Sequence, residues 1–228
     1  QTGTGKTAAF ATPIIQRLAA DRRSPGQRGV RTLVLAPTRE LAAQICESFR
    51  VYGKFEKISA FAVFGGVPLG RQIQTLARGI DVLVATPGRL LDLANQRAVN
   101  LSNVEILVAD EADHMMDMGF IVPLKRIAKM LPRQRQTLFF SATMPREIEE
   151  LAAEFVTDPM RVEAAPVAST VDRINQGVIH IDRSMKMPLL VDLLKDKAIE
   201  RALVFARTKH GANRLAEQLY ENGIAAEA

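Results

Sequence analysis

The chain has 228 residues, of which 47% are hydrophobic and 24% are charged. This composition is typical of a folded globular protein and excludes a disordered or collagen-like chain, and the length allows one large domain or two smaller ones. The 30 Lys and Arg residues outnumber the 25 Asp and Glu residues, an excess that suits nucleic-acid or phosphate partners without requiring them. The longest uncharged runs, such as residues 58–70, fall short of the roughly 20 apolar residues that cross a membrane, so we expect no membrane partner.

The cysteine content and the first residues bear on where the protein works. The single cysteine, Cys46, cannot form an internal disulfide, which favours a reducing compartment and predicts a cytoplasmic protein. The chain starts at Gln1 and shows no secretory pattern. We therefore expect a fragment that lacks both ends of a longer protein.

The first part of the chain alternates between apolar runs and amphipathic stretches. Residues 30–36 form a β-branched apolar run that predicts a strand buried on both faces, and residues 39–55 carry the spacing of a helix with Thr38 as its N-cap. The same alternation predicts strands at 58–64, 82–85, 106–109 and 137–140, and helices at 8–20, 69–77, 88–95, 120–130 and 145–155. Repeated strand-then-helix order predicts an α/β fold with a parallel sheet flanked by helices.

A break in this pattern predicts a second domain. Residues 163–176 mix Ala, Pro, Ser and Thr without periodicity, which is typical of a linker. Strands at 178–181 and 202–205, helices at 189–197 and 210–221, and the start of another strand at 223–228 are expected after it. We therefore divide the chain into a first domain at 1–162, a linker at 163–176 and the truncated beginning of a second domain at 177–228.

A phosphate-binding sequence stands at the start of the chain, before the first predicted helix. Gly3, Thr4, Gly5, Lys6 and Thr7 match the last part of the pattern G-x-x-x-x-G-K-[ST]. In this pattern the glycines let backbone N–H groups surround phosphate oxygens, the lysine reaches the β and γ phosphates, and the hydroxyl binds Mg²⁺. Taken alone, the stretch is also compatible with a chance glycine-rich turn.

An acidic tetrad follows the predicted strand at residues 106–109 directly. Ligands of open α/β sheets bind at the carboxyl ends of strands, so Asp110 is placed to bind Mg²⁺ directly or through water. Glu111 is then the candidate base that orients and deprotonates the attacking water. A solvated acidic turn is the alternative for an isolated tetrad, and the phosphate loop upstream argues against it.

Three short motifs follow the first three predicted strands after residue 30. Threonine hydroxyls, backbone N–H groups at glycines and helix starts, and arginines are suitable contacts to a sugar-phosphate backbone and read no base. Each motif by itself is equally compatible with a strand-to-helix turn or a solvated charge. Their residues are Pro37, Thr38 and Arg39; Gly65 and Gly66; and Thr86, Pro87, Gly88 and Arg89.

In this order, the phosphate loop, the three motifs and the tetrad from Asp110 to Asp113 resemble the DEAD-box RNA helicases of superfamily 2. The resemblance covers nearly the whole chain. It implies that the three motifs hold one RNA strand and that Ser141 and Thr143 bind Asp113 and link hydrolysis to strand separation. Helix capping is the alternative for the two hydroxyls. Residues 202–216 resemble the start of the second helicase lobe, in particular that of the bacterial RhlE-like subgroup.

The resemblance implies a RecA-like first lobe and the first β-α units of a second RecA-like lobe. The implied activity is RNA-stimulated ATP hydrolysis with ATP and Mg²⁺, coupled to RNA unwinding or remodelling of RNA–protein complexes. An RNA clamp without unwinding and a DNA-directed translocase stay open as alternatives. We expect the 228-residue chain itself to be weakly active or inactive, because it shows neither the adenine-reading motif nor the later arginines of the family. The implied catalytic residues are Lys6, Asp110, Glu111, Asp113, Ser141 and Thr143, and the implied metal ligands are Thr7 and Asp110.

Overall fold

The computed structural model describes residues 5–163, 175, 177–196 and 198–228. The chain forms two compact units, Gln1–Arg161 and Val162–Ala228. Of the predicted linker at 163–176, only residues 163 and 175 lie within the described ranges. None of the helices in these ranges is long and apolar enough to cross a membrane.

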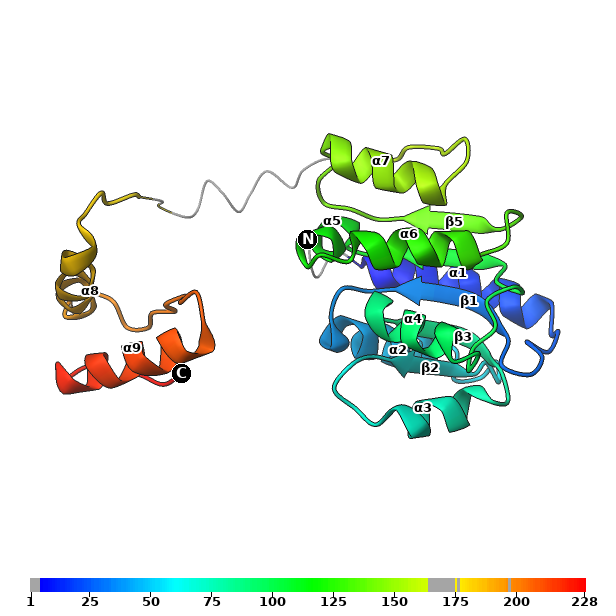
Figure 1. Cartoon of the computed structure of the whole chain (residues 1–228), viewed down its shortest axis with the longest axis horizontal. Helices are drawn as coiled ribbons and strands as arrows, with labels where there is room; N and C mark the ends of the chain where they lie inside the picture. Colours follow the sequence, from blue (N-terminus) through cyan, green and yellow to red (C-terminus); the bar gives the residue numbers. More distant parts are fainter. Residues whose placement is uncertain (1–4, 164–174, 176, 197) are drawn as a thin grey trace. The chain divides into compact units, whose positions relative to one another are not determined.

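The first unit is built on a five-stranded sheet in which every pairing is parallel, in the order β2-β3-β1-β4-β5 (Figure 1). This confirms the predicted parallel α/β sheet. The strands are β1 (Val30–Leu35), β2 (Ala60–Val63), β3 (Ile80–Ala85), β4 (Ile106–Ala109) and β5 (Gln136–Phe139).

The register brings the carboxyl ends of all five strands level. Leu35 at the end of β1 pairs with Ala85 of β3 and with Ala109 of β4, and these two pair in turn with Val63 of β2 and Phe139 of β5. Each of these five residues is the last of its strand. The loops that follow the strands therefore leave the sheet along one edge, the rim that the sequence analysis assigns to ligands.

In the described part of the first unit, seven helices cover the two faces of the sheet. Alternate strand residues point to opposite faces, so Leu33 and Leu107 pack into one core cluster and Val34 and Val108 into the other. Helices α1 and α2 complete the cluster that contains Val34 and Val108. Helices α3 to α7 complete the cluster that contains Leu33 and Leu107. The helices are α1 (Lys6–Ala20), α2 (Arg39–Tyr52), α3 (Leu69–Leu76), α4 (Pro87–Asn95), α5 (Ala112–Asp117), α6 (Ile121–Met130) and α7 (Arg146–Phe155).

One helix of the first unit is absent from the sequence-based prediction. The short helix α5 begins inside the acidic tetrad, at Ala112, where the sequence predicts no helix. Six residues are too few for a helical periodicity to stand out. Its formation depends on tertiary packing, because the side chains of Ala112 and Met115 are fully buried in the core.

The second unit keeps the predicted helices but not the predicted strands. It contains a 3₁₀ turn, η2 (Arg183–Met185), followed by α8 (Lys186–Leu194) and α9 (Lys209–Glu221). The strands predicted at 178–181 and 202–205, and the strand start at 223–228, are wrong: these residues are irregular. An apolar run becomes a strand only when a neighbour accepts its backbone hydrogen bonds, and no described residue does so here. The first unit shows that such neighbours come from distant parts of the chain. There, β1 pairs with β3 and β4 rather than with β2, the next strand along the chain.

We expect Leu107→Ala to lower the free energy of unfolding of the 228-residue chain by about 2–5 kcal/mol, because it opens a cavity in the middle of the sheet. Leu107 is fully buried on β4, between β1 and β5. The control Val122→Ala on α6 shortens a side chain that is 56% exposed. It should change the free energy of unfolding by less than about 0.5 kcal/mol. Urea unfolding followed by circular dichroism measures both, and equal losses would contradict the prediction.

Candidate functional site

The amino end of α1 forms one side of the site at the rim of the sheet. Gly5 adopts the left-handed conformation, with φ 78°, and no described side chain caps the first turn of the helix. A Cβ on Gly5 would meet nothing within 4 Å among the described residues, so these leave space next to Gly5. The first N–H groups of a helix lack intrahelical partners and attract anions. Gly3 and Thr4 lie outside the described residues.

Lys6 and Asp110 meet across the rim, although they lie 104 positions apart in the sequence. The Lys6 Nζ atom lies 3.5 Å from the Asp110 Oδ1 atom, and the Asp110 side chain is only 3% exposed. Burial raises the pKa of Asp110, and the charge of Lys6 opposes that rise. The structure thus places a buried carboxylate next to one ammonium group at the open end of α1, with Thr7 half-buried in the first turn.

The residues present fit a Mg²⁺–phosphate group better than a cation held by protein alone. Within the described ranges, no three His, Cys, Asp or Glu side chains gather in a group that could hold a metal ion. Magnesium usually keeps several waters and is bound by one or two carboxylates together with substrate phosphates. The carboxylate of Asp110, the hydroxyl of Thr7 and the open helix terminus supply this incomplete set.

Glu111 turns the chain from β4 into α5 in a strained conformation. Its backbone lies in the left-handed region, with φ 52° and ψ 54°, which costs a residue with a Cβ about 1–2 kcal/mol. The strain is maintained by the surrounding fold, as is often seen at functional sites. One oxygen of its carboxylate, Oε2, lies 3.4 Å from the Nδ1 atom of His114, one turn along α5.

Sequence reasoning missed His114. The three histidines of the chain lie far apart in the sequence, and none has the spacing of a metal site. A prediction of α5 would have found it, because residues three apart face each other on a helix.

Asp113 binds the loop that follows β5. Its Oδ2 atom accepts hydrogen bonds from the N–H groups of Ala142 (3.1 Å) and Thr143 (3.0 Å) and from the Thr143 hydroxyl (3.1 Å), while its own N–H donates to the Ser141 hydroxyl (3.3 Å). Partial burial acts to raise the pKa of Asp113, but the hydrogen bonds from Thr143, His114 and Ser141 outweigh it and hold the pKa below its ordinary value.

These contacts show which groups Ser141 and Thr143 bind. The N-cap of α7 is Pro145, and no described side chain caps that helix. Both hydroxyls are instead engaged with Asp113. Neither hydroxyl caps α7, but the Ser141 hydroxyl accepts a hydrogen bond from a backbone N–H in the first turn of α5, that of Asp113.

The loops after β1 and β2 meet at the rim. The Thr38 side chain accepts a hydrogen bond from the Leu41 N–H and caps α2, as predicted. The Arg39 guanidinium lies 5.2 Å from the centre of the Phe64 ring, which is a cation–π contact. A Cβ on Gly66, whose φ is 78°, would lie 2.7 Å from an Arg39 nitrogen, so the glycine allows this close approach.

The loop after β3 is tied to the same place. Arg89 donates to the carbonyl oxygen of Val67 at 3.2 Å, and its side chain is only 12% exposed. The alternative that Arg89 is a solvated charge is therefore wrong. Gln72 on α3 donates to the Phe64 carbonyl at 3.1 Å and is buried; sequence reasoning missed it, and no local pattern marks it. The remaining residues of the predicted motifs also lie on these loops: Pro37, Thr86 and Pro87 are buried, and Gly65 and Gly88 are partly buried.

Comparison with known proteins agrees with this arrangement. The profile of the DEAD/DEAH box helicase family matches residues 1–151. The chain belongs to this family. It is 41% identical over 227 residues to the DEAD-box ATP-dependent RNA helicase CshA of Bacillus subtilis and 41% identical over 224 residues to the RNA helicase CrhR of Synechocystis.

The matches to these DEAD-box relatives cover 100% and 98% of this chain but only 45% and 44% of theirs, so the chain spans less than half of their length. A solved structure of a DEAD box protein from the hyperthermophile Methanococcus jannaschii is 33% identical, with a TM-score of 0.64. That match covers 100% of this chain and 60% of the other. It supports the RecA-like form of the sheet described above.

In this DEAD-box chain, we expect Thr143→Val to raise the pKa of Asp113 toward its ordinary value, because the variant removes one hydrogen bond to the carboxylate. The lowered pKa stabilises the fold above the carboxyl's unfolded-state pKa, and this contribution is lost as the pH falls through the folded-state value. As the pH falls, the Thr143→Val variant should therefore lose this stabilising contribution at a higher pH than the parent chain. Carboxyl-carbon NMR of Asp113 measures the titration. The control Thr75→Val should leave the titration unchanged, since the Thr75 hydroxyl donates to the Arg71 carbonyl within α3. An unchanged titration in Thr143→Val would contradict the prediction.

We expect Gly66→Ala to lower the free energy of unfolding by about 1–2 kcal/mol, because alanine is strained at positive φ. Its Cβ would also displace the Arg39 guanidinium from the Phe64 ring. The control Gly70→Ala lies four positions along, on α3, where a Cβ meets nothing within 4 Å. It should not lower stability, because alanine favours a helix. Urea unfolding compares the two, and equal stability would show that Gly66 is not required by the backbone.

Proposed function

We propose that the complete protein is an ATP-dependent RNA helicase, in which RNA-stimulated ATP hydrolysis drives local duplex unwinding or remodelling of RNA–protein complexes. The observation that carries the proposal is the pairing of Lys6 with buried Asp110 at the open end of α1. The curated relatives CshA and CrhR are named RNA helicases. This supports RNA as the partner.

ATP and Mg²⁺ are the proposed cofactors. The N–H groups at the start of α1 and the Lys6 ammonium would hold the phosphates, together with Gly3, Thr4 and Gly5. Thr7 and Asp110 would hold the cation. When bound, Mg²⁺–ATP supplies the phosphoryl group that is transferred and neutralises part of its charge.

Glu111 is the proposed base. It is partly exposed next to Asp110 and is held by its strained backbone at the end of β4, so its carboxylate can accept a proton from a water on the open side of the rim. Lys6 contacts Asp110 through its ammonium group, which would also hold the phosphates. This division leaves one acidic residue for the cation and the next one for the water.

RNA contact is proposed for the loops after β1, β2 and β3. The backbone N–H groups at Gly66 and at the start of α2 and α4 suit phosphate oxygens, and Arg39 lies exposed beside them. Arg89 supports the site mainly by bracing the Val67 loop. The full set of proposed contacts is Pro37, Thr38, Arg39, Gly65, Gly66, Thr86, Pro87, Gly88 and Arg89.

Asp113, Ser141 and Thr143 are proposed to couple hydrolysis to movement. Their hydrogen bonds join the tetrad that binds nucleotide to the loop that leads into α7. A shift of the tetrad on hydrolysis would therefore displace this loop. The two ends of the linkage are rigid elements, β4 and α7, which can transmit such a shift.

Residues 1–162 are proposed as the first helicase lobe, 163–176 as the linker and 177–228 as the start of the second lobe. The division into two compact units near residue 161 supports this assignment. The RhlE-like subgroup is proposed on residues 202–216 alone, and the relatives named above carry other names, CshA and CrhR. A cytoplasmic location is proposed from Cys46, whose thiol is free and buried.

The test is phosphate release by the complete protein with Mg²⁺–ATP and either no nucleic acid, single-stranded RNA or single-stranded DNA of the same sequence. Stimulation by RNA alone is expected, because only RNA offers the 2′-hydroxyl. Equal stimulation by DNA would favour a translocase. ATP binding without hydrolysis would favour a clamp.

Glu111→Gln in the complete protein should keep ATP affinity and lose about 10²- to 10⁴-fold in turnover, because the amide cannot take a proton from water. The control Glu147→Gln changes an exposed side chain in the first turn of α7 and should retain parental turnover. Nucleotide-binding titrations and phosphate release measure the two quantities separately. Near-parental turnover in Glu111→Gln would remove Glu111 from the role of base.

A further inference from the structure

A pocket of about 750 Å³ lies at the end of the sheet opposite the rim, where the strands begin. Arg28 and Asn100 line it, and they flank Gly29, which forms a parallel bridge with Asn100 just before β1 begins. Arg97 follows the end of α4, and Met130 is the last residue of α6. Helices that cross back over a parallel sheet end where the strands begin, so the pocket lies at the amino ends of the strands.

Two arginines face this pocket from strained backbone positions. Arg28 has φ 57° and Arg97 has φ 54°, in the left-handed region that residues with a Cβ seldom occupy. Backbone bonds fix Arg28, whose N–H donates to the Ala77 carbonyl and whose carbonyl accepts from the Asn100 N–H at 2.7 Å. These bonds hold the backbone of Arg28 in place next to Asn100.

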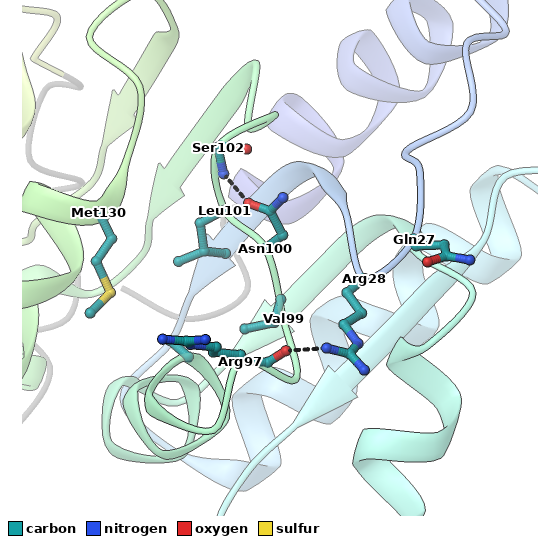
Figure 2. A pocket seen from close by; sticks show the side chains of 9 residues that line it. Gln27, Arg28, Arg97, Val99, Asn100, Leu101, Ser102 and Met130 are labelled. Carbon is teal, nitrogen blue, oxygen red and sulfur yellow. Dashed lines mark hydrogen bonds between the residues drawn. The ribbon is translucent and has the colours of Figure 1, made fainter.

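The positive charge of the pocket is not neutralised. One Arg28 nitrogen donates to the Arg97 carbonyl at 2.9 Å (Figure 2). The Arg97 guanidinium has no hydrogen-bond or ion-pair partner among the described residues, and no carboxylate lines the pocket. Elsewhere on this unit, Arg23 and Arg31 are paired with Glu105. Both arginines are exposed, and their guanidinium groups can exchange water for anionic groups.

The remainder of the lining combines an apolar floor with polar edges. Figure 2 shows Gln27 and Arg28 on one side, Met130 on the other, and the segment from Arg97 to Ser102 between them. Met130 is 41% exposed. The other apolar lining residues are Ala94, Val99 and Leu101. A ligand that satisfies the whole pocket needs both negative charge and apolar side chains.

A peptide fits this chemistry better than RNA does. Bases bind single-strand sites largely by stacking on aromatic side chains, and the lining contains none. RNA phosphates would reach the arginines but would leave the apolar floor uncovered. Aspartate or glutamate next to leucine or a similar residue satisfies both parts of the lining.

We propose that this pocket docks a short acidic segment of a partner protein in which carboxylates alternate with apolar side chains. Arg28 and Arg97 bind the carboxylates, and Met130 covers an apolar side chain. Because the pocket and the rim lie at opposite edges of the sheet, the partner can remain bound while RNA and nucleotide occupy the rim. The site therefore tethers the lobe without blocking its chemistry.

The test is fluorescence anisotropy of the 228-residue chain with a fluorescein-labelled peptide of alternating leucine and aspartate. Arg97→Glu should weaken binding at least about tenfold, and Met130→Ser about threefold or more. The control Arg71→Glu makes the same charge change on an exposed face of α3 and should stay within about twofold of the parent. Circular dichroism of each variant confirms that the chain is folded.

Matched probes separate the proposal from its rivals. Peptides of leucine with lysine, or of serine with aspartate, should bind more weakly, and saturating single-stranded RNA should leave the parent peptide affinity within about twofold. The proposal is overturned if the acidic peptide does not bind at about 1 mM, or if it binds Arg97→Glu as tightly as the parent. Displacement of the peptide by RNA, or loss of RNA binding in Arg97→Glu, would assign the pocket to RNA instead. None of these measurements needs ATP hydrolysis, so they stand apart from the proposed helicase activity.

Discussion

All five strands of the sheet run in one direction and end level, and the chemistry of the site depends on that alignment. The loops that carry Thr38, Gly66, Thr86, Asp110 and Ser141 each follow a different strand, so only the parallel register brings them to one edge. A slip of one residue would turn the side chains of a strand to the opposite face. It would also move the loop away from its neighbours. The buried β-branched core of the sheet thus fixes the site, because it permits one register.

The two aspartates of the tetrad show how the fold assigns different chemistry to one residue type. Asp110 ends a buried strand, where loss of water raises its pKa and leaves its charge to be balanced by Lys6. Asp113 is the second residue of α5 and is surrounded by donors that lower its pKa. The first therefore suits a cation, and the second suits a permanent hydrogen-bond link to Thr143. The strained backbone of Glu111 separates the two environments.

The arginines of the first unit fall into distinct structural groups. Arg31 is buried and joined to Glu105, so it stabilises the base of the sheet. Arg89 braces a loop through the Val67 carbonyl. Arg97 has no hydrogen-bond or ion-pair partner among the described residues and lies at the end of the sheet opposite the rim. The arginines of the first unit therefore lie on two separate surfaces, one at the rim and one at the amino ends of the strands.

The sequence by itself determined what depends on neighbours in the chain: the alternation of strands and helices, the Thr38 cap and the position of the tetrad at a strand end. The tertiary structure decided which groups meet. It formed α5 by burying Met115, brought His114 to Glu111 and placed Gln72 under the Phe64 loop. It also left the predicted strands of the second unit unformed, because a strand needs a partner that is distant in sequence. Local patterns encode how each segment can fold, but contacts between distant segments select what it does.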